Sequence, residues 1–223
     1  MFRGIYICEP YRLIGKIRTV KELVDKGMIG KVEYVINECH IPEFPQASWM
    51  DSYTDPCIED LGYHHFACLH YLFGISTRSL CAISYKASWS KHSSNTSAAI
   101  IAETMEGYHL NWSTYWAAGG KTTEYIGDLL IEGTKGSVLV NKEGVHYTPR
   151  NGSKIKIDEL PNLYTDNWGP VAHVLKWLYQ EYRCPGPNTY ERPFTIESFG
   201  PVIRFIYTAL ESAHSSLPKH CSI

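Results

Sequence analysis

The middle of the chain carries a run of short strand-like segments, and the sheet that they imply constrains the fold more than any other feature. Each segment is apolar or alternates apolar and polar residues, and turn residues such as Glu106-Gly107 separate several neighbours. The predicted strands are Ser79–Ala87, Ala98–Met105, Tyr108–Trp116, Tyr125–Glu132, Ser137–Val140, Val145–Thr148 and Lys154–Ile157.

Helical patterns stand on both sides of this run. Apolar residues recur at steps of three and four residues, which predicts amphipathic helices, and Thr195 has a side chain that can cap the last of them. Pro201 predicts a kink or a late start in that last helix. The predicted helices are Leu13–Met28, Glu59–Phe73, Trp168–Tyr182 and Ile196–Ser215, and two further strands are predicted at Ile5–Cys8 and Lys31–His40.

Helices, then consecutive strands, then helices predict an α+β fold with a large, mostly antiparallel (mixed) sheet. We expect the helices to pack on one face of this sheet and to leave the other face open for association.

Composition and charge exclude several classes of function. The formal net charge is −2 with a pI near 6.5, so there is no basic surplus of the kind that nucleic-acid binding requires. We expect no membrane partner, because no apolar run is long enough to cross a bilayer, and no signal peptide is evident at the start. Seven scattered cysteines fit free thiols in the cytoplasm better than a disulfide framework.

The stretch Glu59-Asp60-Leu61-Gly62-Tyr63-His64-His65-Phe66 is the best candidate for chemistry. Asp60 and His64 are four residues apart, so on a helix they share a face, and a carboxylate beside an imidazole forms a workable acid/base pair. The alternative is that Asp60 caps the helix and His64 is a structural histidine. A metal site is a weaker interpretation, because the histidines show no closed set of ligands with metal-site spacing.

Four phrases, in a fixed order, resemble a known family. They are the segment from Glu9-Pro10-Tyr11-Arg12 to Ile29-Gly30-Lys31-Val32, a loop with Trp49, the Asp60-to-His64 helix that ends at Gly74, and Gly133-Thr134-Lys135-Gly136. A C-terminal helix rich in small residues follows. Over nearly the whole chain, this order resembles the C-terminal domain of the family of glucose–fructose oxidoreductase, inositol dehydrogenase and MocA.

The resemblance implies a function. Members of the family pass a hydride between a sugar or polyol carbon and a nicotinamide ring, so NAD or NADP is the implied cofactor. The resemblance implies that His64 acts on the proton of the substrate hydroxyl and that Asp60 orients or charges His64. It places Arg12, Trp49 and Tyr125 at the substrate, against the alternatives of a surface salt bridge for Arg12 and core packing for Trp49 and Tyr125.

The family's nucleotide-binding half is not recognisable here. No G-x-G-x-x-G occurs anywhere in the sequence, so no cofactor-binding residue is predicted in this chain. We expect residues 1–12 to be the remnant of the last strand of that half and residues 13–223 to be the substrate-binding and oligomerisation domain. Alone, this chain is predicted to be inactive. We expect a homo-oligomer joined through the sheet face. The sequence leaves three origins open: an excised domain, the product of a truncated or split gene, or a subunit that a separate nucleotide-binding chain completes.

Two alternatives remain open at this point. One is a non-catalytic dimerisation or interaction module derived from the same family, which would keep the sheet and lose the chemistry. The other is a zinc or other metal hydrolase, which rests only on the ten histidines.

Overall fold

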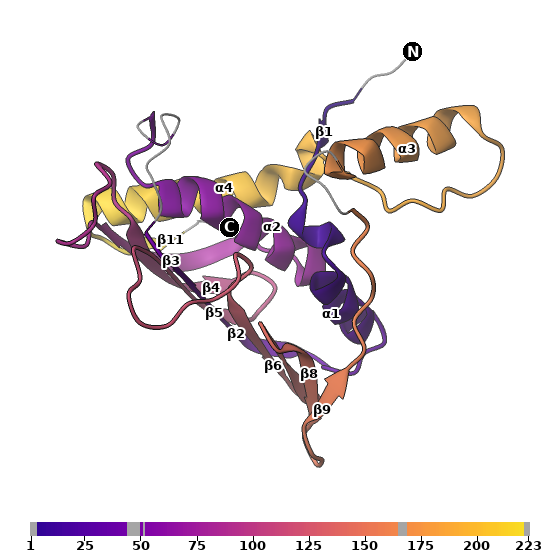
Figure 1. Cartoon of the computed structure of the whole chain (residues 1–223), viewed down its shortest axis with the longest axis horizontal. Coiled ribbons are helices and arrows are strands. Elements are labelled where there is room, and N and C mark those ends of the chain that lie inside the picture. Colours follow the sequence, from indigo (N-terminus) through magenta and orange to yellow (C-terminus); the bar gives the residue numbers. More distant parts are fainter. Residues whose placement is uncertain (1–3, 44–49, 51, 165–168, 221–223) are drawn as a thin grey trace.

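The computed structural model of the chain describes residues 4–43, 50, 52–164 and 169–220 (Figure 1). Its main element is a mixed sheet of nine strands in the order β11-β3-β4-β5-β2-β6-β7-β8-β9. Neighbouring strands are antiparallel except for the central pair β2 and β5, which run parallel. The strands are β2 Val32–Ile41, β3 Thr77–Tyr85, β4 Ser97–Thr104, β5 His109–Trp116, β6 Asp128–Gly133, β7 Gly136–Asn141, β8 Gly144–Pro149, β9 Ile155–Ile157 and β11 Lys219–His220.

The helices confirm the predicted α+β class. They are α1 Gly15–Asp25, α2 Gly62–Phe73, α3 Gly169–Arg183 and α4 Ile196–Ser215, with short helical turns η1 Tyr11–Leu13 and η3 Cys57–Leu61 before α1 and α2. Figure 1 shows α1, α2 and α4 on one face of the sheet, whereas α3 projects from the body beside β1 (Tyr6–Ile7). The core therefore lies between the sheet and three helices.

Strand residues alternate between the two faces of the sheet, as a period of two requires. On β4, Ile100 is fully buried against the helices, while Ile101 points to the other face and is 67% exposed. Trp112 of β5 lies at the centre of the core, where its ring centroid is 5.0 Å from that of Phe66, and Phe66 in turn contacts Phe205 of α4.

The start of α4 is where the sequence predicts it. Thr195 Oγ1 accepts a hydrogen bond from the backbone N–H of Ser198, and Ser198 Oγ accepts one from the N–H of Thr195. This capping box satisfies two backbone donors that the first helical turn leaves without partners. The helix begins at Ile196 and contains Pro201, so the late start that Pro201 suggested does not occur.

One strand boundary differs from the prediction, and it matters for the site. The predicted strand Tyr125–Glu132 begins only at Asp128, and Tyr125 lies in the preceding turn. That turn contains Gly127 at a φ of +75°, where a Cβ atom would lie 2.7 Å from the carbonyl oxygen of Glu38. Only glycine fits both the left-handed backbone and the close approach to β2, so the pairing of β6 with β2 cannot start earlier.

Candidate functional site

His64 lies near the start of α2 and is held by a carboxylate that is distant in the sequence. Its Nδ1 atom is 2.7 Å from Oε1 of Glu9, whose side chain is fully buried, while the His64 side chain is 25% exposed. Glu9 follows β1, and its Oε2 atom accepts a hydrogen bond from the backbone N–H of Arg12. An ionised Glu9 makes Nδ1 the donor, which leaves Nε2 to exchange a proton with another molecule.

Aromatic rings fix the plane of the His64 imidazole. The Tyr11 ring stacks on it with centroids 4.5 Å apart and an interplanar angle of 13°, and Tyr63 meets it edge-on at 5.1 Å. Burial raises the pKa of both tyrosine hydroxyls, so both rings remain neutral at physiological pH. The contacts with Tyr11 and Tyr63 limit rotation of the His64 imidazole, and the hydrogen bond to Glu9 determines which of its nitrogens faces inward.

Asp60 is near His64, but it is not the hydrogen-bonded partner that the spacing suggested. It lies in η3, a wider π-helical turn that joins α2 at Gly62 and alters the side-chain spacing of a regular α-helix. Burial raises the pKa of the Asp60 carboxyl, and the charge of His64 acts in the opposite direction. The two groups therefore interact electrostatically, and the hydrogen bond that orients the ring comes from Glu9 instead.

Arg12 is buried inside the domain. Its Nη1 atom donates to the carbonyl oxygen of Arg192 at 2.6 Å, and its guanidinium lies 4.9 Å from the centre of the Phe194 ring. Burial lowers the pKa of Arg12, while the charge of Glu191 raises it. These contacts anchor η1 to the segment that leads into α4. Arg12 is therefore not in a surface salt bridge, and its predicted role at the substrate stays a prediction.

Trp49 and Tyr125 are the other two residues predicted to contact the substrate. Trp49 lies outside the described residues. Tyr125 has an exposed ring (58%), so it is not part of the core, and its carbonyl oxygen accepts a hydrogen bond from Nε2 of His65 at 2.6 Å. A role for either side chain at a substrate stays a prediction.

His65 connects α2 to the sheet directly behind His64. Its Nδ1 atom accepts a hydrogen bond from the indole N–H of Trp112 at 2.9 Å, while Nε2 donates to Tyr125, so both ring nitrogens of a neutral imidazole are satisfied. Complete burial lowers its pKa to about 4. His65 is therefore a fixed, uncharged support that holds the first turn of α2, and with it His64, against the sheet.

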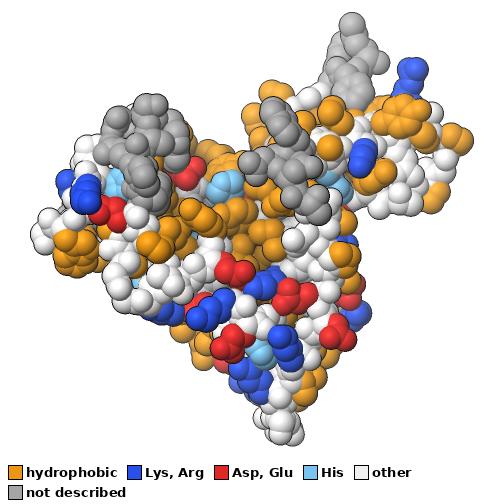
Figure 2. All heavy atoms as spheres, in the orientation of Figure 1, with side chains coloured by type: hydrophobic (Ala, Val, Ile, Leu, Met, Phe, Trp, Pro, Cys, Tyr) orange, Lys and Arg blue, Asp and Glu red, His pale blue; other side chains and the backbone are white. Residues whose placement is uncertain are grey.

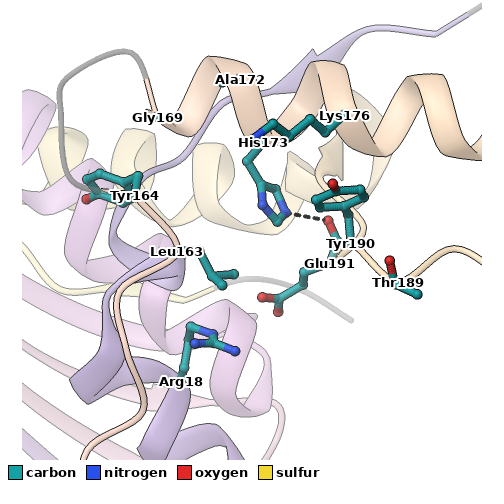
Figure 3. Close-up of a pocket in the computed structure, with 10 residues that line it drawn as sticks. All are labelled: Arg18, Leu163, Tyr164, Gly169, Ala172, His173, Lys176, Thr189, Tyr190 and Glu191. Atoms are coloured by element: carbon teal, nitrogen blue, oxygen red, sulfur yellow. Dashed lines mark hydrogen bonds between the residues drawn. The ribbon is translucent and has the colours of Figure 1, made fainter.

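A polar cavity of about 510 Å³ lies next to this site, between α1, α3 and the segments around Tyr164 and Glu191. Figure 3 shows that Arg18 and the Glu191 carboxylate point into the same space. The His173 ring lies above them and donates from Nε2 to the Glu191 carbonyl oxygen. Tyr164 forms one wall; burial raises the pKa of its hydroxyl, and the charge of Glu9 adds to the rise. The cavity and the Glu9–His64 pair are thus within electrostatic reach of each other.

In the ranges that the structure describes, no three His, Cys, Asp or Glu side chains converge as metal ligands would. No helix there has both the length and the apolar character to cross a bilayer.

Sequence reasoning missed Glu9 and Tyr11 as members of the site. Both belong to the phrase Glu9-Pro10-Tyr11-Arg12, which was quoted for the family resemblance. That phrase did not indicate that either residue contacts His64. Glu9 and His64 are separated by 55 positions, and no periodicity connects residues at that separation. A buried carboxylate at the end of a short apolar strand was the available clue, since such a group needs a partner.

Comparisons with known proteins show which family and which solved structures this chain is similar to. A model of the GFO/IDH/MocA C-terminal domain matches residues 17–139. A search of curated proteins finds no match. Among solved structures, an oxidoreductase from Agrobacterium radiobacter in complex with NAD+, L-tartaric acid and magnesium is similar, with a TM-score of 0.76, 19% identity and coverage of 97% of this chain and 65% of that one.

A second similar structure is the aldose-aldose oxidoreductase from Caulobacter crescentus complexed with glycerol, with a TM-score of 0.75 and 13% identity over 98% of this chain and 64% of that one. At these identities the likeness shows the fold alone. The chain spans less than two thirds of the length of either structure.

Proposed function

This chain belongs to the GFO/IDH/MocA family, whose C-terminal domain it contains, and on that basis we propose that it is the substrate-binding and oligomerisation domain of a cytoplasmic NAD(P)-dependent oxidoreductase. The substrate class is a sugar, a polyol or a related molecule with a CH–OH group. The observation that carries the proposal is the Glu9–His64 pair, a partly exposed imidazole whose inner nitrogen is held by a buried carboxylate.

The geometry supports proton transfer at one defined atom. Glu9 holds Nδ1 of His64, so Nε2 can accept the proton of a substrate hydroxyl during oxidation and return it during reduction. Glu9 stabilises the charged ring that forms, and Tyr11 and Tyr63 keep its plane fixed. Asp60 adds a second negative charge nearby when it is ionised.

The hydride acceptor is not held by this chain. A nicotinamide supplies the hydride chemistry in such enzymes, yet the sequence has no glycine-rich turn between a strand and a helix that would hold its pyrophosphate. The residues present therefore do not fit the cofactor, and we expect the chain alone to be inactive. The solved relatives are longer by about the size of a nucleotide-binding half.

The test is turnover by this chain joined to the nucleotide-binding part of the Agrobacterium radiobacter oxidoreductase, screened over sugars and polyols with NAD+ and NADP+. His64→Ala is expected to lower kcat by about 100-fold or more, because the proton acceptor is lost. His70→Ala is the matched control on the same helix, since His70 binds the Ser198 carbonyl oxygen instead. Full activity of His64→Ala would refute the catalytic assignment.

Glu9→Gln separates orientation from charge. Glutamine keeps the length of the side chain but cannot stabilise a charged ring, so kcat should fall and the pH at which kcat/KM rises should move. A fusion that folds and binds NAD+ but turns over no member of the panel would favour the alternative of a non-catalytic interaction module.

The open face of the sheet supports the oligomerisation part of the proposal. Large apolar side chains point outward from β2, β3 and β4, with Tyr34 44%, Ile83 56%, Tyr85 44% and Ile101 67% exposed. The register places Ile101 opposite Cys81 on one side and Asn111 on the other, so these residues lie on one face. A contiguous apolar face of this kind indicates an interface, and a second copy of the chain is the proposed occupant.

Ile101→Lys is expected to convert this oligomer to a monomer in analytical ultracentrifugation at micromolar concentration, because a charge would be buried at the interface. Ile155→Lys on β9 makes the same change at a residue that is 49% exposed on the helix-bearing side, and it should leave the mass unchanged. A wild-type chain that stays monomeric would contradict the proposal.

A further inference from the structure

The polar cavity between α1 and α3 holds charged side chains that the proposed proton transfer at His64 does not use. Its volume of about 510 Å³ is typical of sites for small molecules. The charged residues that line it are Arg18 of α1, Lys176 of α3 and Glu191, which lies just before β10 (Phe194–Thr195), the strand that pairs with β1. His64 does not line this cavity, so the cavity is a space separate from the candidate acid/base site.

Charged side chains elsewhere on the molecule form ion pairs. Figure 2 shows charged side chains of both signs gathered over the lower part of the molecule, around α1, β8 and β9. Lys16 of α1, for example, forms an ion pair with Glu124. Within the ranges that the structure describes, Arg18, Lys176 and Glu191 form no ion pair with each other or with another residue. Such charges around a cavity favour a ligand that supplies the opposite charges.

The Arg18 guanidinium can bind a carboxylate in the cavity. Its Nη1 atom donates to the Pro161 carbonyl oxygen at 2.6 Å. A guanidinium has several N–H donors in a planar fork, so this contact leaves most of them for a ligand. The fork matches a carboxylate, with which it forms two parallel hydrogen bonds. Because Arg18 and the Glu191 carboxylate point into the same space (Figure 3), a carboxylate on Arg18 would have a negative group beside it.

Glu191 is held in place through both its backbone and its side chain. Nε2 of His173 donates to the Glu191 carbonyl oxygen at 2.9 Å, and burial lowers the pKa of His173, so this ring is neutral at physiological pH. Burial and then the hydrogen bond to Glu191 raise the pKa of Tyr71, so the Tyr71 hydroxyl keeps its proton and donates to the carboxylate. An ionised carboxylate has further lone pairs. Glu191 can therefore still accept hydrogen bonds from an ammonium group in the cavity.

The loop that carries Glu191 is held against α3 by further hydrogen bonds. Asn188 Nδ2 donates to the Trp177 carbonyl oxygen at 2.9 Å. Oε1 of Gln180 accepts hydrogen bonds from the backbone N–H of Thr189 at 3.1 Å and from its hydroxyl at 3.0 Å. A site that is ordered before a ligand arrives loses less free energy on binding. The cavity is therefore pre-organised on the side that Glu191 occupies.

We propose that this cavity binds an acidic α-amino acid, glutamate or aspartate. The lining carries two positive charges and one negative charge, and such a ligand carries the complementary set. Arg18 binds the α-carboxylate, Glu191 the α-ammonium and Lys176 the side-chain carboxylate. A neutral sugar would leave these charges without ionic partners. The proposal goes beyond the proposed function, because this binding needs neither a nicotinamide nor His64.

The first test is calorimetric titration of the purified chain with L-glutamate and matched analogues. Glutamine lacks the side-chain charge, 2-hydroxyglutarate has a hydroxyl in place of the ammonium, and 4-aminobutyrate lacks the α-carboxylate. Each analogue is expected to bind at least about tenfold more weakly, because it leaves a charge of the cavity unpaired. Equal binding of 2-hydroxyglutarate would overturn the amino-acid assignment. Absence of binding by both glutamate and aspartate at about 10 mM would overturn the site itself.

Variants of the chain locate the bound ligand. Arg18→Lys keeps the charge but removes the planar fork, so it should weaken glutamate binding by about tenfold. Lys176→Met should remove the preference for glutamate over glutamine. Arg78→Lys is the matched control, since Arg78 pairs with Glu103 on the sheet, and it should bind glutamate as the wild type does. Unchanged binding in both cavity variants would place the ligand elsewhere and overturn the proposal.

These outcomes are distinguishable from those of the proposed function, because binding is measured on the chain alone and needs no turnover. Selective binding of glutamate together with an inactive fusion would support the amino-acid site and refute catalysis alone. Turnover by the fusion without amino-acid binding would refute the site alone.

Discussion

Asp55→Ala is expected to destabilise the domain by about 3–5 kcal/mol, because it removes a fully buried carboxylate that several elements share. Oδ1 of Asp55 accepts hydrogen bonds from Ser84 Oγ at 2.5 Å and from Asn95 Nδ2 at 2.9 Å, and Oδ2 is 2.6 Å from Nε2 of His214. These partners come from β3, from the loop before β4 and from α4. Alanine leaves all of them without their acceptor.

The measurement is thermal unfolding of the two proteins side by side, in which the loss should lower Tm by roughly 6–20 °C for a chain of this size. Asp25→Ala is the control. Asp25 forms an exposed ion pair with Lys21 one turn away on α1, and such pairs contribute less than about 0.5 kcal/mol. Equal losses for the two variants would show that the Asp55 cluster is not a stabilising junction.

The same carboxylate predicts acid sensitivity with a defined sign. Burial raises the pKa of Asp55, but the hydrogen bonds from Ser84, Asn95 and His214 outweigh it, so the net pKa is lowered. A carboxylate with a lowered folded-state pKa contributes its full stability above its ordinary pKa. That contribution is then lost as the pH falls below about 4, through the lower pKa of the folded state.

A second large effect is expected from His65 at milder pH. Its folded-state pKa is about 4, against an ordinary value of 6.5, so the unfolded chain takes up a proton at a pH at which the folded domain does not. The free energy of unfolding is therefore full above pH 6.5 and falls between pH 6.5 and about 4. The pKa difference corresponds to a loss of about 3 kcal/mol across that window.

His65→Gln tests this assignment. A glutamine amide can donate to the Tyr125 carbonyl oxygen and accept from the Trp112 indole, so it replaces both hydrogen bonds without a titrating group. Urea unfolding at several pH values should show a flatter dependence between pH 6.5 and 4.5 for this variant than for the wild type. His70→Gln should retain the wild-type dependence. An identical slope in His65→Gln would assign the pH sensitivity to another group.

Most of the sheet could be predicted from the sequence because its signals are local. Hairpins such as β4–β5 show two alternating strands around a turn glycine, here Gly107 at a φ of +89°, and Thr195 shows its capping role within three residues. The pairing of β2 with β5 and β6, the ribbon β1–β10 and the edge strand β11 were beyond this reasoning. Each joins segments that are distant along the chain and share no local pattern.

In the candidate site, too, local features could be predicted from the sequence, whereas contacts between distant segments could not. His64 was identified from a motif on one helix, whereas its actual hydrogen-bond partner, Glu9, comes from another part of the chain. The π-helical turn at Cys57–Leu61 also has no sequence signature that we used, and it is what makes the Asp60 spacing a poor guide to side-chain contact. Arg12 was predicted at the substrate; the structure buries it against the Arg192 carbonyl oxygen, and its role at a substrate stays a prediction.

The central position of β2 has a consequence for how the chain folds. The hairpins β3–β4–β5 and β6–β7–β8 each consist of strands adjacent in sequence, so each can form early from local contacts. They join only through β2, which is made before both and pairs parallel with β5 and antiparallel with β6. On the ribosome, β2 therefore cannot complete its pairing until residues up to Gly133 have emerged. This high-contact-order step is expected to limit the folding rate, and it leaves an apolar strand exposed to misassembly during synthesis.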